Sequence, residues 1–159
     1  MAQKDNELLL KVLCAMLPYE VIVKDRNATH TLSVGNTEFA DLFSGKCNIR
    51  PYLRPMSSMT EGEVKELLKV HIITKYGEDS DYYKNLIRIE RISMHDNNSW
   101  SAWIAYKRDY DEFTTCFIIG RVTWETTINE IDWLNKNHFD YCGLIPRGLA
   151  LEAPEGMYK

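Results

Sequence analysis

Three strand-like runs in the middle of the chain constrain the fold most. They are rich in β-branched and aromatic residues and span 86–94, 100–107 and 114–124. The segments between them, 95–99 and 108–112, are too short for a parallel crossover, which needs about a dozen residues or more. The spacing therefore predicts an antiparallel three-stranded meander.

A second pair of strands is expected nearer the start of the chain. Residues 19–24 and 29–34 are β-rich and flank Asp25-Arg26-Asn27, a composition typical of a hairpin turn. Strands that follow one another this closely pair antiparallel. We therefore predict a mainly antiparallel sheet that contains this hairpin and the meander.

Helical patterns at three places complete an α+β fold. Asn6 is the expected cap of the first helix, which Pro18 ends, and Gly77 is the expected stop of the second. Two helices begin with a capping box, in which a Thr and the Glu three residues later satisfy each other's backbone donors: Thr60 with Glu63, and Thr127 with Glu130. We predict about three helices on one face of the sheet.

Length and composition favour a single domain. The chain has 159 residues, of which 45% are hydrophobic and 26% charged, which excludes wholesale disorder and collagen-like or coiled-coil structure. We predict one globular domain over 1–159. Its last part, 139–159, is punctuated by Gly and Pro and is expected to pack as an irregular strap.

The net charge, the cysteines and the hydropathy of the chain bear on its binding partners and its cellular compartment. The formal net charge of −4 provides no global field for a phosphate backbone, so any nucleic-acid surface must be local. The cysteines lie far apart and are expected to be reduced and buried: Cys14, Cys47, Cys116 and Cys142. The apolar stretch 8–17 contains Lys11 and lacks the flanks of a signal peptide. We expect a cytoplasmic protein of a bacterial host cell, without membrane association.

Familiar catalytic and cofactor motifs do not occur in the sequence. It has no Gly-rich phosphate loop, dinucleotide fingerprint, nucleophile elbow or zinc-ligand spacing. His71 with His95-Asp96 suggests a dinuclear metal site, but a helix-face histidine and a hairpin loop explain these residues better. We expect no cofactor and no metal, and the sequence leans against an enzyme.

The first candidate site is a basic and aromatic segment. Pro51 and Pro55 forbid a helix and remove two ladder donors, so an exposed edge strand is expected. In an extended chain, residues of equal parity share a face, which groups Lys46, Arg50, Tyr52 and Arg54. Such a stripe can hold phosphates and stack on a base or a peptide. Alternatively, the arginines simply pair with acidic residues of the following helix.

The second candidate site is a polar cluster within 132–141, near the expected end of the last helix. Its hydrogen-bonding side chains are Asn135, Asn137, His138, Asp140 and Tyr141. His138 and Asp140 could form an acid-base pair. Because no nucleophile or metal is evident beside them, a structural role at the helix C-terminus is favoured.

Several segments are similar to those of one protein family. They are PYLRPMSSMTE (51–61), DWLNKNHFDY (132–141), GLI (143–145), GLA (148–150) and APEGMY (153–158). They resemble a family of small uncharacterised phage and prophage proteins of Bacteroides-type gut bacteria. The chain departs from that pattern at Gly62 and Cys142, where Glu and Arg are usual. The resemblance implies a mobile-element origin and an intracellular setting, and it carries no activity.

Two functional hypotheses follow. The first is a non-catalytic interaction module that binds a protein or nucleic-acid partner through its basic and aromatic edge. The alternative is a small enzyme with a polar pocket around His138, Asp140 and Tyr141. The first is preferred because the sequence offers charged and aromatic surface without a complete catalytic constellation.

Overall fold

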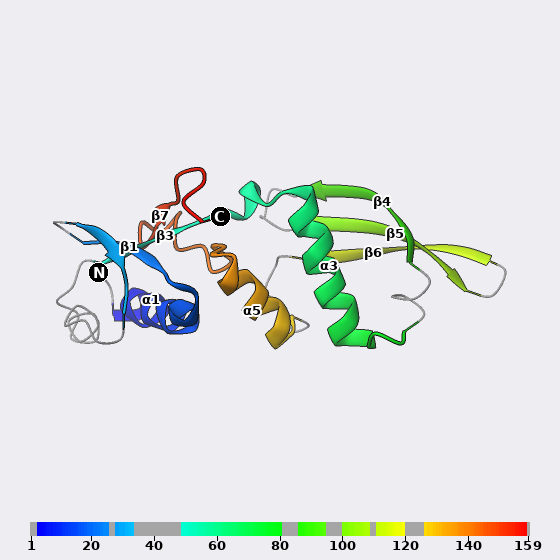
Figure 1. Cartoon of the computed structure of the whole chain (residues 1–159), viewed down its shortest axis with the longest axis horizontal. Coiled ribbons are helices and arrows are strands. Elements are labelled where there is room, and N and C mark those ends of the chain that lie inside the picture. The colour runs from blue at the N-terminus through cyan, green and yellow to red at the C-terminus, as the bar shows by residue number, and fades with distance from the viewer. Residues whose placement is uncertain are drawn as a thin grey trace. The chain divides into compact units, whose positions relative to one another are not determined.

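A computed structural model describes residues 3–25, 28–33, 49–80, 86–94, 100–108, 111–119 and 126–158. Within these ranges the chain has an α+β fold, as predicted, with helices beside mainly antiparallel strands (Figure 1). It divides into two compact units. The first unit comprises Met1–Pro55 and Leu134–Lys159, and the second comprises Met56–Trp133. A single domain over 1–159 stays a prediction.

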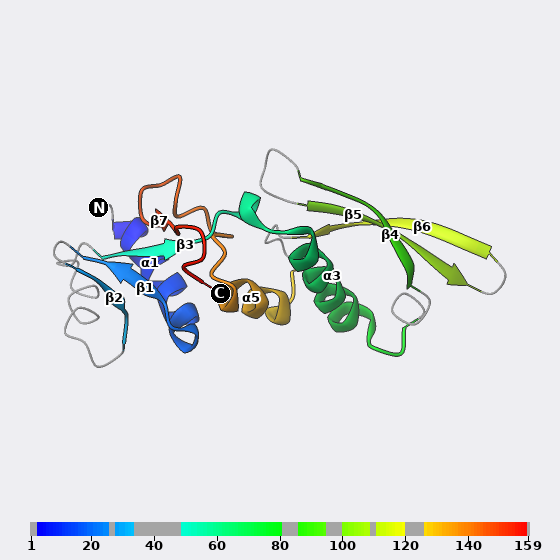
Figure 2. The same cartoon turned by 45° about the horizontal axis from the view of Figure 1, so that its top comes forward.

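The first unit contains a four-stranded sheet in the order β2-β1-β3-β7 (Figure 2). Strands β1 (Ile22–Lys24) and β2 (Thr29–Thr31) form the predicted hairpin, and Ala28 N–H donates to the Asp25 side chain in the turn (2.7 Å). Strand β3 (Arg50–Leu53) pairs antiparallel with β1. Strand β7 (Leu151–Glu152) pairs parallel with β3. The segment 139–159 thus supplies a strand as well as irregular turns.

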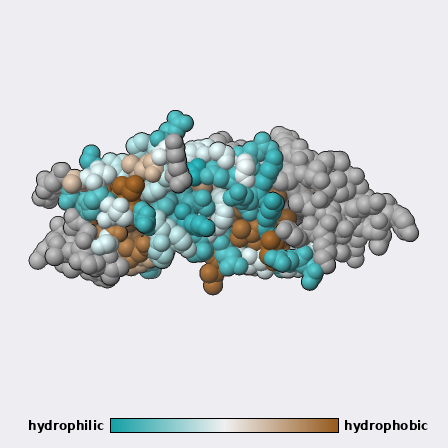
Figure 3. Space-filling view, viewed as in Figure 1, coloured by the Kyte–Doolittle hydropathy of each residue, from teal (hydrophilic) through white to brown (hydrophobic). Residues whose placement is uncertain are grey.

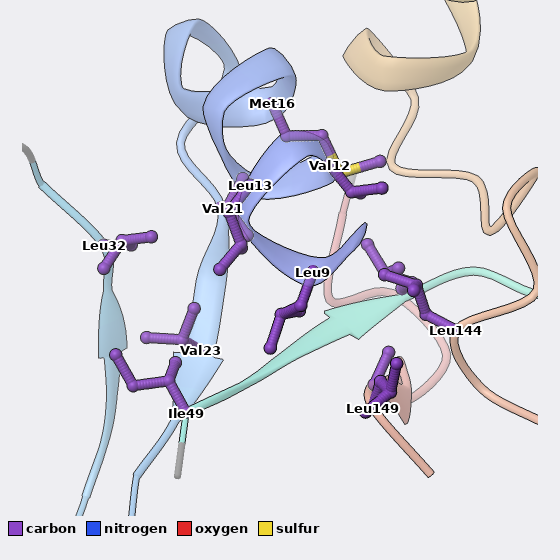
Figure 4. Close-up of a cluster of buried hydrophobic side chains, with 12 residues drawn as sticks. Leu9, Val12, Leu13, Met16, Val21, Val23, Leu32, Ile49, Leu144 and Leu149 are labelled. Atoms are coloured by element: carbon purple, nitrogen blue, oxygen red, sulfur yellow. The ribbon is translucent and has the colours of Figure 1, made fainter. Parts of the chain in front are cut away.

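Helix α1 (Gln3–Met16) supplies much of the core of the first unit (Figure 4). Its apolar face meets side chains of the sheet and of the C-terminal segment in one buried cluster: Leu9, Val12, Leu13, Met16, Val21, Val23, Leu32, Ile49, Leu53, Leu144, Leu149 and Ala150. Leu9, Leu13 and Met16 recur at helical spacing, which places them on the buried face of the helix.

The ends of α1 differ in how well the sequence predicts them. The helix begins at Gln3, so the prediction that Asn6 caps it is wrong. The residues before Asn6 continue the helix, and Asp5 places a favourable negative charge in its first turn. The helix ends at Met16, and Pro18 lies in the following short 3₁₀ turn η1 (Leu17–Tyr19), as the missing proline N–H dictates.

The second unit contains the meander and helix α3. Strands β4 (Leu86–Met94), β5 (Trp100–Arg108) and β6 (Asp111–Ile119) pair antiparallel in sequence order, which confirms the meander. Helix α3 (Glu61–Tyr76) follows the short turn η2 (Met56–Ser58) and packs across β5 and β6 (Figure 1). The hairpin and the meander lie in separate sheets, whereas the sequence suggested one sheet.

Both predicted capping boxes are present. In α3, Glu63 N–H donates to Thr60 Oγ1 (3.3 Å), and Thr60 N–H donates to the Glu63 carboxylate (2.8 Å). Helix α5 (Ile128–Lys136) starts with the same arrangement between Thr127 and Glu130. Gly77 ends α3 with a φ of 84°, a backbone conformation that glycine adopts without a side-chain clash.

A buried side-chain hydrogen bond joins α3 to the start of α5. His71 Nδ1 lies 3.0 Å from Glu130 Oε1, and both side chains are almost fully buried. Glu130 Oε2 meanwhile accepts hydrogen bonds from the backbone and hydroxyl of Thr127 (both 2.9 Å). One carboxylate therefore caps one helix and anchors another. This places His71 in a structural role, while His95 and Asp96 lie outside the described residues.

Surface exposure corrects the prediction for the cysteines. Cys14 and Cys116 are exposed free thiols, and Cys142 is a half-buried one. Cys116 lies opposite Trp103 on the meander, and both face solvent because successive residues of a strand alternate between its two sides. Cys47 lies outside the described residues.

The described surface is largely hydrophilic, with small hydrophobic patches on the face shown in Figure 3. The large hydrophobic residues that are exposed belong to the second unit, and Ile128 is the most exposed of them at 83%. Among the described helices, none has the length and apolar composition to cross a membrane.

Candidate binding pocket

The first unit contains a pocket of about 420 Å³. It is formed where η1 leads into β1, where β3 ends, and where the segment after α5 meets the C-terminal residues. The residues that line it are Tyr19, Glu20, Ile22, Thr31, Arg54, Lys136, Asn137, His138, Met157 and Tyr158. Its volume lies within the range of small-molecule sites, which span about 300 to 1,000 Å³.

His138 forms part of the pocket wall and is held from several directions. Its Nε2 lies 2.7 Å from the carbonyl oxygen of Tyr19, and its ring stacks on Tyr158 with centroids 3.7 Å apart and planes 6° from parallel. The residue is only 6% exposed. These contacts fix the orientation of the imidazole ring.

The protonation state of His138 follows from these surroundings. Burial lowers the pKa of the imidazole, the positive charge of Arg54 lowers it further, and the hydrogen bond to Tyr19 opposes both effects only in part. The ring is therefore neutral at neutral pH. A carbonyl oxygen only accepts, so Nε2 carries the hydrogen and Nδ1 has a free lone pair.

Backbone strain marks the same pocket. Within the described ranges, the non-glycine residues with positive φ are Glu20 (56°) and His138 (58°). Both line the pocket, and Tyr19, which precedes Glu20, accepts the His138 hydrogen bond. Left-handed backbone at non-glycine residues is costly and is concentrated at functional sites. This strain is an observation independent of the pocket's shape.

Arg54 extends β3 into the pocket wall. Its N–H donates to the His138 carbonyl, and its own carbonyl accepts from Asp140 N–H, both at 2.8 Å, which forms a parallel bridge to Phe139. Its guanidinium carbon lies 4.2 Å from the centre of the Phe139 ring, a cation–π contact. The backbone and the cation of Arg54 are thus both positioned by the segment that carries His138.

The predicted basic and aromatic stripe is placed differently from expectation. The prediction of an exposed edge is wrong, because β3 has β1 on one side and β7 on the other. Arg50 and Tyr52 are half-buried and do not line the pocket, while Arg54 does. Lys46 lies outside the described residues. The sequence could not show the covering strand, because β7 has only two residues and lies about a hundred positions away.

The second predicted cluster is divided by the structure. Asn137 and His138 line the pocket, whereas Asn135, Asp140 and Tyr141 do not. Both Asp140 oxygens accept backbone hydrogen bonds from the following turn, and the Tyr141 hydroxyl donates to Asn135 Oδ1 (2.9 Å). Burial raises the pKa of Tyr141 to about 12. A pairing of His138 with Asp140 as acid and base is therefore not formed.

Tyr158 is a pocket residue that sequence reasoning missed as a site. Its hydroxyl donates to the Tyr52 carbonyl (2.8 Å) and accepts from Ile22 N–H (3.2 Å), so it bridges β3 and β1. Burial raises its pKa to about 12, and the phenol therefore stays protonated. Its one sequence signal is its position in the APEGMY segment, which does not indicate the contact with His138.

Removal of the Tyr158 hydroxyl tests this bridge. Tyr158→Phe keeps the ring on His138 and loses two hydrogen bonds, so we expect the free energy of unfolding to fall by about 1 to 2 kcal/mol in urea titrations. Tyr52→Phe is the matched control, because the Tyr52 hydroxyl makes no hydrogen bond within the described part of the chain. Equal stability of Tyr158→Phe and Tyr52→Phe would contradict the bridging role.

Comparisons with known proteins add no assignment. No family model, curated protein or solved structure matches the chain. Across the described residues, no cluster of three or more His, Cys, Asp or Glu side chains is arranged to hold a metal ion.

Proposed function

We propose that this chain is a non-catalytic binding module that holds a small anionic molecule in the pocket of the first unit. The observation that carries the proposal is the meeting of the two segments singled out by the sequence. Arg54 comes from the basic segment and His138 from the polar cluster, and both line one strained, half-enclosed site. The proposed binding site is therefore this pocket, and not the exposed sheet edge that the sequence suggested.

The charges around the pocket favour an anion. Arg54 and Lys136 contribute two cations, and Glu20 is the one acidic residue among the lining residues named above. His138 adds no charge because its pKa is lowered. The net balance is positive in a chain whose overall charge is −4. Arg54 is half-buried, so its field is screened less than that of a surface arginine.

We further propose that the protein serves as an accessory protein of a phage or another mobile element. The support is the resemblance of its motifs to the phage and prophage family. Most of the lining residues belong to those motifs: Arg54, Lys136, Asn137, His138, Met157 and Tyr158. Three of the five segments that carry the resemblance therefore contribute residues to the pocket.

Two variants of equal charge test the proposed site. Arg54→Gln removes a pocket cation, while Arg50→Gln removes a cation of the same strand that does not line the pocket. Binding of inorganic phosphate, citrate, malate, succinate and AMP is measured by isothermal titration calorimetry. We expect Arg54→Gln to weaken binding of any anion that binds by about tenfold, and Arg50→Gln to leave it nearly unchanged.

Two results would overturn this proposal. One is that none of the anions binds, and the other is that Arg50→Gln and Arg54→Gln weaken binding equally, which would indicate general electrostatics. Circular dichroism of both variants shows whether the fold is kept, because Arg54 also contacts Phe139.

A small enzyme remains the second candidate, on one observation. His138 presents an unprotonated Nδ1 in a lined pocket, and such an atom can accept a proton from a bound molecule. Proton NMR of each bound anion over a day distinguishes the two functions. Unchanged spectra support the binding module, and conversion of the ligand that is lost in Arg54→Gln supports the enzyme.

A further inference from the structure

We propose that the pocket selects small acids that carry a hydroxyl next to their anionic group, and that His138 is the residue that recognises this hydroxyl. This inference rests on the proposed function and names the ligand class for the same site. The simplest members of the class are 2-hydroxycarboxylates. Three features of the site support this preference: the tautomer of His138, the accessibility of its second nitrogen, and the cation that lines the same pocket.

The first feature is the tautomer. The Tyr19 carbonyl can only accept, so the short contact of 2.7 Å requires the hydrogen of the neutral ring to reside on Nε2. Nδ1 is then a hydrogen-bond acceptor and cannot donate. A neutral ring fixed in this way therefore accepts a hydrogen bond from a ligand donor at Nδ1, whereas a protonated ring would donate there.

The second feature is the accessibility of Nδ1. Among the described residues, every fully buried side-chain nitrogen or oxygen has a hydrogen-bond partner. The one side-chain hydrogen bond of His138 in this part of the chain uses Nε2, so Nδ1 has no protein partner. Nδ1 must therefore be accessible to solvent, although the residue is more than nine-tenths buried. The pocket that His138 lines offers the route for that access.

The third feature is the neighbouring cation. Arg54 is close enough for its charge to lower the pKa of His138, and both residues line the same pocket. A carboxylate that pairs with Arg54 enters the same pocket as Nδ1. An oxygen held there cannot satisfy Nδ1, because both atoms are acceptors. A hydroxyl next to the anionic group supplies the missing hydrogen.

The arrangement is also preorganised for this recognition. The His138 ring is fixed by the Tyr158 stack and the Tyr19 hydrogen bond, and its backbone is left-handed. Little conformational entropy is lost when a ligand binds to a side chain that is already immobile. The left-handed backbone at His138 is consistent with this preorganised role.

Matched pairs of acids test the hydroxyl preference. Malate differs from succinate, and lactate from propionate, by one hydroxyl next to a carboxylate. By isothermal titration calorimetry we expect each hydroxy acid to bind about tenfold more tightly than its partner. The difference stays modest because the pocket is open to water, which partly satisfies Nδ1 in the absence of a hydroxyl.

Two substitutions separate the nitrogens of His138. His138→Gln can still donate to the Tyr19 carbonyl but has no acceptor at the Nδ1 position, so the affinity ratio of malate to succinate should fall toward one. His138→Asn keeps an acceptor near the Nδ1 position, and Asn tolerates left-handed backbone, so the ratio should be retained. Thermal unfolding of both variants shows whether they fold. The affinities for malate and succinate are compared within each variant, so a general loss of affinity does not change their ratio.

The outcomes distinguish failure of this inference from failure of the proposed function. Equal binding of malate and succinate, with both lost in Arg54→Gln, overturns the hydroxyl preference and leaves the anion site intact. A malate preference that persists in His138→Gln overturns the role of His138. If none of these acids binds, and phosphate, citrate and AMP also do not bind, both proposals are overturned.

Discussion

Replacement of Glu130 by Ala is expected to lower the free energy of unfolding by about 3 kcal/mol. The substitution removes the acceptor of His71 Nδ1 and, at the same time, the partner of Thr127 in the capping box of α5. Both losses occur in a buried place where water replaces the contacts poorly. Urea denaturation followed by circular dichroism measures the change.

Two further variants separate the two roles of Glu130. Glu130→Gln keeps an acceptor for the helix cap and removes the charge, so it should destabilise less than Glu130→Ala. A double-mutant cycle with His71→Ala isolates the contact between the two side chains, for which we expect a coupling of about 1 to 3 kcal/mol. If the effect of the double substitution equalled the sum of the two single effects, the hydrogen bond between His71 and Glu130 would contribute nothing to stability.

The same carboxylate gives the stability a pH dependence of defined sign. Burial raises the pKa of Glu130, but hydrogen bonds from His71 and Thr127 together outweigh it, and the net pKa is below the usual value. The charged form is therefore favoured by folding. Its contribution is present above the unfolded pKa of about 4.3 and is lost as the pH falls through the lower folded pKa. The stability difference between wild type and Glu130→Gln should accordingly shrink below about pH 4.

The second large effect is expected for Asp140→Ala in the first unit. The two carboxyl oxygens of Asp140 accept the N–H groups of Leu144 (2.7 Å) and Ile145 (2.8 Å). Leu144 is part of the core, so the loss leaves a buried donor unsatisfied and loosens the turn that delivers this leucine. We expect a loss of about 2 to 4 kcal/mol in the free energy of unfolding.

Asp140→Asn provides the control for this prediction. Asn keeps one acceptor oxygen and should recover roughly half of the loss, because one of the two N–H groups is again satisfied. Anion binding serves as a second readout, since Asp140 does not line the pocket. If Asp140→Asn lost binding while its stability matched wild type, the structural assignment of Asp140 would be wrong and an acid-base role would return.

Local signals in the sequence predicted the secondary structure well. The capping boxes at Thr60 and Thr127 depend on residues three positions apart, and the hairpin and the meander depend on short loops between neighbouring strands. Interactions of this kind are settled within a few residues, so one sequence suffices to find them. The failure at Asn6 shows the limit, because a good cap residue is also tolerated inside a helix when the preceding residues extend it.

The candidate site depended on contacts between distant parts of the chain. The sequence indicated Arg54 and His138 as functional residues, but in two separate sites. It grouped Arg54 with Arg50 and Tyr52, and His138 with Asp140, and none of these three partners lines the pocket. The contacts that hold them, the bridge from Arg54 to Phe139 and the stack of His138 on Tyr158, join residues up to about 85 positions apart. Periodicity and motif spacing carry no information about such pairs.

The sequence by itself therefore determined the element types, the helix boundaries set by the two capping boxes, Pro18 and Gly77, the α+β class and three of the residues that line the pocket wall. Only the tertiary structure decided that β7 covers β3, that the hairpin and meander belong to different sheets, and that Asp140 organises a turn instead of assisting His138. The physical reason is the distance along the chain over which each interaction acts. Backbone hydrogen bonding and hydrophobic periodicity act locally, whereas burial, strand order and the protonation state of His138 are set by neighbours that only folding brings together.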